Sequence, residues 1–329
     1  MAHSAAMRQD TPTPIDAVLI GRNEGARLVA ALRALTAQVR SVVYVDSGST
    51  DDSVAAAQAA GARVVCLDMS VPFSAARARN AGFDALDPQG YVLFIDGDCA
   101  LDPGFLAPAI AHLDANPDTA LVTGWRRETA PGDSLYNRLC DWEWHRPAGP
   151  IASCGGDILV RAKAWRQAGG QNPALIAGED EEFCLRLGAA GWQMTRLPVT
   201  MTHHDAHMMR FGQWWARATR AGHAFAQIGT LFPDHWRAER RRTLVYALAL
   251  PALTAGATAT LGPAGLLPLL AYPYNLARSA RALARDGVTD RRLALAGLLV
   301  LSKLPNMIGM ARFWARRARG AHMTLIEYK

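Results

Sequence analysis

The run from Tyr91 to Asp98 combines an apolar strand with two carboxylates at its end. Five apolar residues are followed by Asp96, a glycine and Asp98. Two acids this close repel each other unless a cation lies between them. Hard divalent cations bind carboxylate oxygens and bridge to phosphate oxygens. The spacing therefore favours a metal that holds a diphosphate, with Asp98 as the metal ligand and Asp96 facing a nucleotide. A pair of solvated turn acids is the alternative.

A second acid stands at the end of an apolar run, at Asp46, and is followed by Ser47. The residues from Thr50 to Ser53 are typical of helix capping, because their side-chain oxygens accept hydrogen bonds from the first backbone amides of a helix. Capping does not account for Asp46, whose carboxylate is placed to hydrogen-bond a base or a ribose. We therefore predict that Asp46 contacts a nucleotide.

Two arginines, Arg77 and Arg79, stand near the start of a predicted helix that also contains Asn80 and Gly82. A guanidinium offers a planar fork of donors that suits diphosphate oxygens. A solvated helix face is the alternative, but the carboxylate pair follows closely in the sequence and favours a diphosphate contact.

Four consecutive acids, Glu179 to Glu182, begin a helix after Gly178. The helix dipole favours negative charge at this end, which accounts for Glu181 and Glu182. A carboxylate here is also placed to act as a general base toward an acceptor hydroxyl. Two histidines, His203 and His204, are candidates to complete a metal shell. The sequence does not separate them, and a single histidine is more often structural.

Short apolar runs alternate with helical patterns in the first third of the chain. This alternation predicts a parallel sheet covered by helices on both faces, with ligands bound beyond the carboxyl ends of the strands. The region 119–202 is less regular and is expected to carry the acceptor side, and 207–228 has helical spacing. We predict strands at 17–20, 41–45, 63–67 and 91–95, and helices at 26–35, 53–60 and 75–86.

Charge divides the 329-residue chain unevenly. Residues 1–206 carry 17 Lys and Arg against 24 Asp and Glu, whereas 207–329 carry 18 against 5. In the basic part the charges flank apolar runs and are not interleaved with aromatic residues, so we expect an anionic membrane surface as partner and no nucleic acid. Five cysteines without a Cys-x-x-Cys pair predict reduced thiols in the cytosol.

The segment 243–277 contains no charged residue. Its prolines and glycines argue against one straight span and favour a helix–turn–helix hairpin that turns near 262–265. A second apolar stretch, 293–314, is interrupted by Lys303 and Pro305 and either spans a bilayer or lies in its interface. By the positive-inside rule the basic flanks are cytoplasmic. A buried helical domain with basic ends is the alternative.

The predicted organisation has three parts. Residues 1–14 are polar, lack the apolar core of a signal peptide and are expected to be disordered. Residues 15–230 form the α/β domain, and 231–329 form a membrane-associated helical region.

The ordered motifs resemble family 2 glycosyltransferases of the GT-A fold, a Rossmann-like nucleotide-binding sheet with an acceptor subdomain. The resemblance covers roughly residues 15–223. Asn23 and Glu24 resemble the first nucleotide-binding turn, and Asp46 with Ser47 matches the second. The segment from Arg79 to Gly82 is similar to the one beside the diphosphate. The remaining matches are Asp96-Gly97-Asp98 to the metal-binding Asp-x-Asp, Gly156 and Asp157 to the loop before the acceptor site, and Glu179-Asp180 to the pair whose aspartate is the base.

The resemblance implies an inverting, metal-dependent transfer of one sugar from a nucleotide diphosphate sugar. In this reading Asp98, with His203 or His204, binds Mg²⁺ or Mn²⁺, and Asp180, beside Glu179, takes the proton from an acceptor hydroxyl. The basic, apolar C-terminal part leads us to expect a lipid-linked saccharide acceptor at the cytoplasmic face of the plasma membrane, in envelope or exopolysaccharide synthesis.

Other functions stay open. A polyprenyl-phosphate glycosyltransferase differs only in the acceptor, and a non-catalytic membrane scaffold is the rival from outside enzymes. A phosphatase with an Asp-x-Asp nucleophile is disfavoured, because its motif normally follows the first strand and precedes a threonine. A processive synthase is disfavoured because residues 213–217 do not form Gln-x-x-Arg-Trp.

Overall fold

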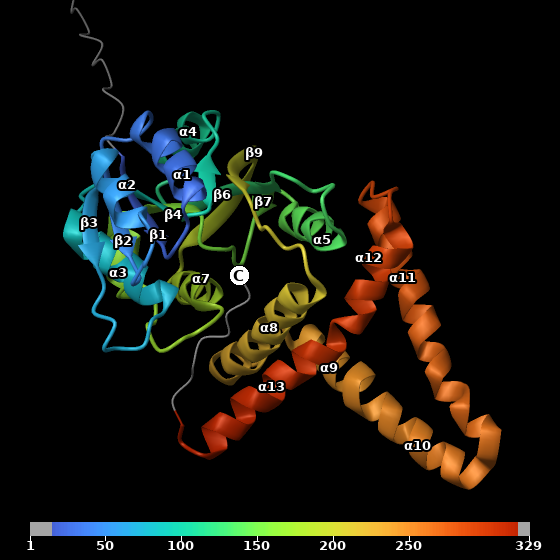
Figure 1. Ribbon diagram of the computed structural model, residues 1–329. Helices are drawn as coiled ribbons and strands as arrows, with labels where there is room; N and C mark the ends of the chain where they lie inside the picture. The colour runs from blue at the N-terminus through green and yellow to red at the C-terminus, as the bar shows by residue number, and fades with distance from the viewer. Residues whose placement is uncertain (1–14, 322–329) are drawn as a thin grey trace, which may run out of the picture.

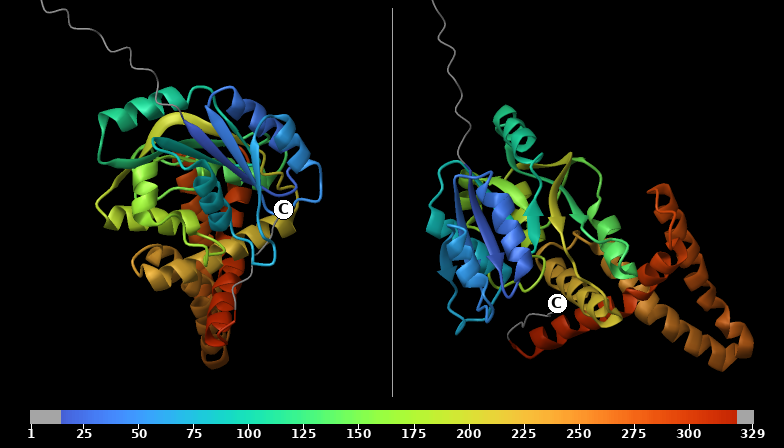
Figure 2. Two further views of the ribbon diagram at one scale, coloured as in Figure 1. Left: turned by 90° about the vertical axis from the view of Figure 1, so that its left-hand side faces the viewer. Right: turned by 45° about the horizontal axis from the view of Figure 1, so that its top comes forward.

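The computed structural model describes residues 15–321, so the predicted disorder of 1–14 lies outside the described residues. Figure 1 shows an α/β domain joined to a set of long helices that extend away from it. Within residues 15–321 nine strands form one sheet, in the order β3-β2-β1-β4-β8-β6-β9-β5, with β7 paired to β9. Figure 2 shows the sheet with helices on both of its faces.

The first half of the sheet is parallel, as the sequence predicts. Its strands are apolar runs buried on both sides, which is typical of parallel strands between helices. Leu19 packs on the α1 side and Val18 on the α3 side of the same strand. The strands are β1 (Asp16–Gly21), β2 (Ser41–Asp46), β3 (Arg63–Cys66) and β4 (Tyr91–Asp96), and the helices are α1 (Ala26–Thr36), α2 (Ser53–Ala59) and α3 (Ala75–Leu86).

The second half of the sheet is mixed, and it extends into the region that the sequence analysis describes only as less regular. β8 is antiparallel to both β4 and β6, and β9 is parallel to β6. The region 119–202 is therefore rich in regular structure. β5 (Cys99–Leu101) and α4 (Leu106–Ala115) precede this region. The strands that follow are β6 (Thr119–Glu128), β7 (Gly149–Pro150), β8 (Ile158–Arg161) and β9 (Gln193–His204), and the helices are α5 (Leu135–Trp144), α6 (Ala162–Ala168) and α7 (Glu179–Ala189).

The C-terminal part consists of helices. The predicted turn near 262–265 is confirmed, because α10 ends at Leu261 and the chain reverses through a 3₁₀ segment (Gly262–Leu270). Figure 1 shows α10 and α11 meeting at this corner and diverging from it. The helices are α8 (Phe211–Leu231), α9 (Arg237–Leu244), a π-helical turn (Val245–Ala249), α10 (Leu250–Leu261), α11 (Ala271–Arg285), α12 (Arg292–Leu301) and α13 (Lys303–Ala318).

The last helix, α13, returns to the α/β domain and crosses α8 closely. A Cβ built on Gly222 would lie 2.0 Å from the Asn306 carbonyl oxygen, and one on Gly309 would lie 2.0 Å from that of Thr219. Glycines at both positions thus let the two backbones meet. The stretch 293–314, expected to span or line a membrane, is in part a packing helix of the protein.

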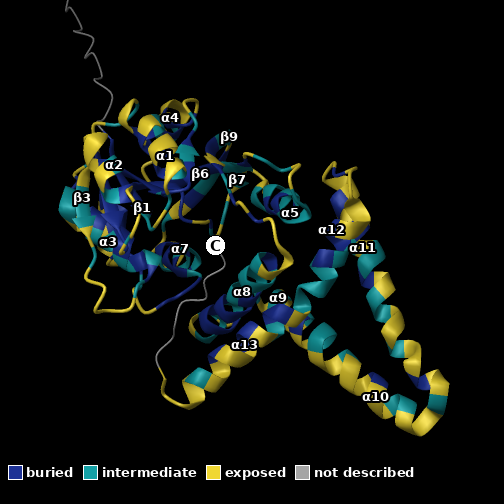
Figure 3. Ribbon diagram, in the orientation of Figure 1, coloured by how far each residue is buried: buried dark blue, intermediate teal, exposed yellow. Residues whose placement is uncertain are grey.

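Helices α9 to α11 expose apolar side chains instead of burying them. Two helical stretches, Arg237–Arg285 and Arg292–Ala318, are long and apolar enough to cross a bilayer, judged by length and composition alone. Only 6% of the most apolar part of the first stretch is buried, against 33% of the second. Figure 3 shows the exposed surface along α10 and α11. The exposed large side chains here are Leu244, Leu248, Leu253, Leu261, Leu266, Leu267, Leu269, Leu270 and Tyr274.

Close packing of α3 on the sheet leads to a first prediction. A Cβ on Gly82 would lie 2.3 Å from Cγ1 of Val18 and 3.0 Å from Cγ2 of Val45. Gly82→Ala is expected to lower the free energy of unfolding by about 1–3 kcal/mol, the usual cost of overpacking a core. Urea unfolding measures it.

Gly188→Ala is the matched control, because this glycine also lies in a helix and a Cβ there would meet only Cε of Met194, at 3.8 Å. It is expected to be neutral or to stabilise the protein by up to about 1 kcal/mol, since alanine favours helix. Equal effects of the two substitutions would contradict the packing argument.

Candidate active site

The guanidinium of Arg79, on α3, joins three segments of the site. It donates to Oδ1 of Asp96 at 2.7 Å, at the end of β4, and to Oδ1 of Asp180 at 2.8 Å, in the first turn of α7. It also lies 3.5 Å from Oε1 of Glu179. Arg79 is buried, and it passes so close to Gly156 that a Cβ there would lie 1.9 Å from its Nη2. The structure thus brings together four of the predicted site residues around one cation.

A second arginine, Arg126 on β6, supports the other side of Asp96. Its Nη2 lies 3.3 Å from Oδ2 of Asp96 and 2.7 Å from Oδ2 of Asp157. Asp157 is buried and also accepts hydrogen bonds from the Asp96 amide at 3.2 Å and the Thr202 hydroxyl at 2.7 Å. Asp157 therefore positions Asp96 and Arg126, and its predicted place beside an acceptor stays a prediction. Arg126 was not among the residues predicted from the sequence. The pattern that could have indicated it is a charged residue that follows an apolar strand run.

Both guanidiniums stay charged in this setting. Burial by itself lowers the pKa of Arg79, but the surrounding carboxylates, Asp180 foremost, raise it above its ordinary value. The pKa of Arg126 is likewise raised, mainly by Asp157 against the effect of burial. The two arginines are thus fixed positive charges among acids.

Asp180 has the environment of a general base. Its Oδ1 accepts from Arg79 and from Nε2 of Gln171, each at 2.8 Å. Burial raises the pKa of Asp180 to about 7, although Arg79 acts in the opposite direction. A carboxylate with such a pKa both accepts and releases a proton readily near neutral pH.

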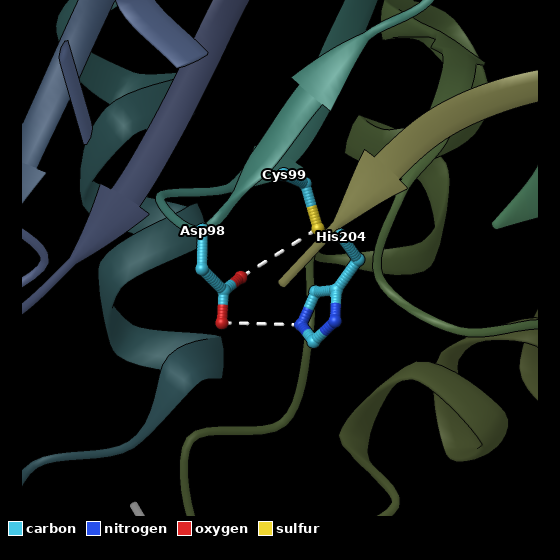
Figure 4. A group of neighbouring side chains, drawn as sticks. All are labelled: Asp98, Cys99 and His204. Carbon is cyan, nitrogen blue, oxygen red and sulfur yellow. Dashed lines mark hydrogen bonds and ion pairs between the residues drawn. The ribbon is translucent and has the colours of Figure 1, made fainter. Parts of the chain in front are cut away.

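Asp98 and His204 form a buried pair next to this cluster. Nε2 of His204 lies 3.1 Å from Oδ2 of Asp98, and its Nδ1 lies 3.9 Å from Oε2 of Glu128. Burial lowers the pKa of His204, but Asp98 and Glu128 outweigh this effect and raise it above the ordinary value. Figure 4 shows Asp98 and His204 pointing toward each other, together with Cys99.

The metal-ligand prediction for His203 is corrected by this geometry. Successive side chains of a strand point to opposite faces, so His203 and His204 of β9 cannot share one site. His203 faces away from Asp98, is 47% exposed in its side chain and lies 2.9 Å from Oδ2 of Asp102. The sequence did not distinguish the two histidines as metal ligands, and the geometry leaves His204 as the candidate.

The two predicted nucleotide-binding turns contact each other. Asn23 accepts a hydrogen bond from the Thr50 amide at 2.7 Å, and the amide of Asn23 donates to Oγ of Ser49 at 2.9 Å. The neighbouring Glu24 lies 3.0 Å from Arg27.

The end of β2 is held by its own loop. Asp46 is buried, and its carboxylate accepts from the amides of Gly48 and Ser49 at 2.9 and 3.0 Å. Ser47, also predicted as a nucleotide contact, is buried beside it. The carboxylate thus shapes the turn after β2, and contact of either residue with a nucleotide stays a prediction.

The start of α7 also contacts the segment that leads to the C-terminal helices. Oε2 of Glu181 lies 3.5 Å from Nε2 of His235, between α8 and α9. The ring of the next residue, Trp236, packs edge-on against Phe225 of α8, with centroids 5.1 Å apart. The first turn of α7, which carries Asp180, therefore contacts the base of these helices.

The donor atoms fit a divalent cation. Asp98, Cys99 and His204 each offer an atom, and these atoms lie within 4.8 Å of one another. Nδ1 of His204 makes no hydrogen bond but lies 3.9 Å from Oε2 of Glu128, and a carboxylate on this side of the ring is the kind of group that orients a metal-bound histidine. Six buried or half-buried carboxylates stand here against two guanidiniums and one imidazole, which leaves negative charge for a cation to offset: Asp96, Asp98, Glu128, Asp157, Glu179 and Asp180.

The sheet has a parallel half with acids at the carboxyl ends of its strands, and it continues into a mixed half. This arrangement is that of the GT-A class of fold. Residues 17–158 match the model of glycosyl transferase family 2. An uncharacterised glycosyltransferase of Mycobacterium tuberculosis is 31% identical over 200 residues, 56% of this chain and 84% of the relative. The chain belongs to glycosyl transferase family 2.

Another relative is longer than this chain. The pre-mycofactocin glycosyltransferase of Mycobacterium tuberculosis is 29% identical over 226 residues, which cover 63% of this chain and 45% of the relative. This chain therefore spans about half the length of that protein.

Solved structures share the fold. The mannosyltransferase PcManGT from Pyrobaculum calidifontis, in complex with GDP-Man and Mn²⁺, matches with a TM-score of 0.60 at 16% identity, over 90% of this chain and 86% of that one. S. aureus TarS with UDP-GlcNAc matches with a TM-score of 0.52 at 12% identity, over 94% and 92% of the two chains. At these identities the likeness is one of fold, and it confirms the predicted GT-A class.

Removal of the Arg79 charge is the second prediction. Arg79→Met leaves Asp96, Glu179 and Asp180 without their cation, so the free energy of unfolding is expected to fall by about 3–5 kcal/mol at neutral pH. Burial already raises the pKa of Asp180 to about 7 while Arg79 opposes this effect, so loss of the guanidinium raises that pKa further and the penalty exists only while Asp180 is ionised. The difference from the wild type should therefore shrink as the pH falls from about 8 to about 5.

Arg166→Met is the control, because Arg166 and Asp87 form a surface pair at 2.9 Å. Such a pair contributes at most about 1 kcal/mol. Chemical denaturation across the pH range measures both variants, and a pH-independent deficit in Arg79→Met would contradict the proposed role of its charge.

Proposed function

We propose that the chain transfers one sugar from a nucleotide diphosphate sugar to a hydroxyl group of an acceptor, with inversion at the anomeric carbon. The observation that carries this proposal is the double contact of Arg79. One buried guanidinium binds both Asp96, at the carboxyl end of β4, and Asp180, at the start of α7. A residue suited to accept a proton is thereby fixed beside the strand end where such sheets bind ligands.

The class of donor follows from the family and from its neighbours in fold. PcManGT was solved with GDP-Man, and TarS with UDP-GlcNAc. Both are sugars joined to a nucleoside diphosphate, the class that the turns around Asn23 and Asp46 are predicted to bind.

Mg²⁺ or Mn²⁺ is the proposed cofactor, held by Asp98 and His204. When bound, such an ion neutralises charge on the departing diphosphate. PcManGT was solved with Mn²⁺, which supports this class of ion. Asp157 and Arg126 fix the position of Asp96 next to the pair, so little of the site has to reorganise.

Asp180 is the proposed base. It takes the proton from the acceptor hydroxyl while the oxygen of that hydroxyl bonds to the anomeric carbon. The bond between this carbon and the diphosphate oxygen breaks on the opposite side, which inverts the configuration. Gln171 and Arg79 both bind Oδ1 of Asp180 and so orient the carboxyl group for this step.

The proposed acceptor is a lipid-linked saccharide at the cytoplasmic face of the plasma membrane, in envelope or exopolysaccharide synthesis. The support is the exposed apolar surface of α10, the 3₁₀ segment and α11, together with arginines at both ends of these helices. Apolar surface of this extent is unfavourable in water, whereas basic residues beside it attract anionic lipids.

The third prediction tests the base. Asp180→Asn keeps the size of the side chain and removes the proton acceptor, so the rate of sugar transfer should fall by about 10²- to 10⁴-fold. Glu181→Gln, one residue along the same helix, should retain most activity. Transfer is followed with radiolabelled nucleotide sugars and membrane lipid extracts, and nucleotide binding is measured in parallel.

The pH dependence provides the control for this assignment. Because the base works when ionised, kcat/KM of the wild type should rise with pH through about 7 and then level off. Unchanged transfer in Asp180→Asn would argue for a lipid phosphate as the acceptor, since an ionised phosphate needs no base. Metal-dependent nucleotide binding without transfer of any sugar would favour the non-catalytic scaffold.

The fourth prediction tests the membrane contact. Leu261 and Leu267 are 67% and 65% exposed at the corner between α10 and α11. Replacing both with Glu should weaken binding to vesicles that contain anionic lipid by at least about tenfold, because each acid opposes insertion by up to a few kcal/mol. Val29→Glu, an exposed position on α1, is the control. Equal vesicle sedimentation of both variants would contradict the proposed membrane surface.

A further inference from the structure

Three basic side chains gather where the C-terminal helices join the α/β domain. Arg242 lies in the last turn of α9, Arg278 lies in α11, and Lys303 is the first residue of α13. We call these three residues the basic junction. The function proposed above gives them no ligand of their own.

Contacts between the helices bring the basic junction together. The chain reverses at 262–270, so α11 runs back along the helix that contains α9 and the π-helical turn. The Tyr272 hydroxyl of α11 donates to the Tyr246 carbonyl of that turn at 2.6 Å. Arg242, one helical turn before Tyr246, is therefore placed beside the part of α11 that carries Arg278. Helix α13 contacts both α9 and the π-helical turn.

Lys303 is half-buried in this junction and lacks an acidic partner of its own. Its Nζ donates to Oγ of the neighbouring Ser302 at 3.2 Å. Among the residues that the structure describes, no carboxylate lies at ion-pair distance from this ammonium. The charges of Arg242 and Arg278 repel it.

Both acids near Lys303 already pair with an arginine. Oε1 of Glu239 accepts a hydrogen bond from Arg242 at 2.6 Å. Oε2 of Glu143, on α5, accepts one from Arg217 of α8 at 2.7 Å. Both acids also attract the ammonium of Lys303, but the basic junction and Arg217 together carry four positive charges against these two negative ones. Like charges at half-buried positions repel each other, and an anion between them removes the repulsion.

The donors of the basic junction suit a phosphate group. A guanidinium offers parallel donors to two phosphate oxygens, and a lysine ammonium binds phosphate as a compact charge. Arg278 is oriented by the buried Asn275, whose Oδ1 lies 3.4 Å from its Nη2. Basic pockets between helices at the cytoplasmic side of a membrane bind the phosphates of lipid headgroups.

The neighbours of the basic junction indicate a phosphate that belongs to the acceptor lipid. On one side, Leu248 of the π-helical turn is 55% exposed and begins the apolar surface that an acyl or prenyl chain would cover. On the other side, Glu143 directly precedes Trp144, whose ring meets that of His204 at a centroid distance of 4.6 Å. The basic junction thus lies between the apolar surface and the proposed active site.

We propose that the basic junction binds the phosphate group of the lipid that carries the acceptor saccharide. The inference rests on the proposed function, because that function supplies the lipid-linked acceptor. It adds a binding site outside the catalytic cluster and defines the chemistry of its ligand, an apolar chain that ends in a phosphate. A lipid bound there holds its saccharide on the α5 side of the active site.

Farnesyl phosphate is the probe, because it combines an apolar chain with a terminal phosphate. Binding of the radiolabelled probe to the immobilised full-length protein is measured in a neutral detergent. We expect saturable binding to the wild type and a loss of affinity of at least about tenfold in Lys303→Met and in Arg278→Met. Arg281→Met and Arg312→Met are matched controls at exposed positions of α11 and α13, and each should change the affinity by less than about threefold. Absence of binding to the wild type, or equal losses in all four variants, would overturn the proposal.

Competition distinguishes the possible sources of the phosphate. Farnesol lacks the phosphate and inorganic phosphate lacks the chain, so each should compete at least about tenfold less well than unlabelled farnesyl phosphate. Phosphatidylglycerol, a bulk anionic lipid, should also compete weakly. If inorganic phosphate competes as well as the probe, the basic junction is a site for free phosphate and the proposal is wrong. Equal competition by phosphatidylglycerol would make it a general anionic-lipid surface, which also contradicts the proposal.

Thermal unfolding adds a readout that a structural defect does not imitate. Lys303→Met removes a charge that its neighbours repel, so the lipid-free variant should unfold at or above the temperature of the wild type. Farnesyl phosphate should raise the unfolding temperature of the wild type, because it binds the folded state, and raise that of the variant less. A variant that unfolds at a lower temperature and gains as much from the probe would count against the proposal. Should Lys303→Met fail to fold, Arg278→Met provides the same test.

Sugar transfer separates this inference from the proposed function. Lys303→Met is expected to raise KM for the lipid acceptor by at least about tenfold and to leave KM for the nucleotide sugar within about twofold. Transfer that is lost in Asp180→Asn but unchanged in Lys303→Met would refute the phosphate site and leave the proposed function standing. Binding of farnesyl phosphate that depends on Lys303, without transfer of any sugar, would support the site and refute the proposed function.

Discussion

One buried cation holds the site together. Arg79 reaches from α3 to the end of β4 and to the start of α7, so that segments about a hundred residues apart meet on a single guanidinium. Its acids repel one another without it, and it would be costly to bury without them. Gly156 leaves the space through which it passes. The position of Asp180, and with it the proposed proton transfer, depends on this arrangement.

The two halves of the sheet contribute different parts of the site around Arg79. The parallel half ends in loops that brace each other through Asn23 and Ser49, as expected of a nucleotide-binding edge. The mixed half supplies Arg126 and His204 from β6 and β9, which lie side by side. Cys99 comes from the short strand β5, which places the thiol by backbone pairing with β9. Rigid strands thus carry most of the polar groups, an arrangement that favours fixed distances between them.

The first half of the fold could be predicted because its strands are buried on both faces and its helices have clear apolar faces. The second half could not, because β6 and β9 alternate apolar residues with Arg126, Thr202 and His204, whose side chains enter the site and disguise the strand pattern. The motif order identified Arg79, Asp96, Asp98 and Asp180. It could not distinguish His203 from His204, because that distinction depends on the register between β9 and β5, a pairing across a hundred residues.

The contact between Glu181 and His235 connects the start of α7 to the segment between α8 and α9. His235 precedes α9, and α13 closes the same base by crossing α8 at Gly222 and Gly309. These contacts place the base of the C-terminal helices beside the first turn of α7, which carries Asp180. The apolar corner at 262–265 lies beyond α10, away from this base. In the proposed membrane-bound state, the length of α10 would therefore set how far the site stands from the lipid.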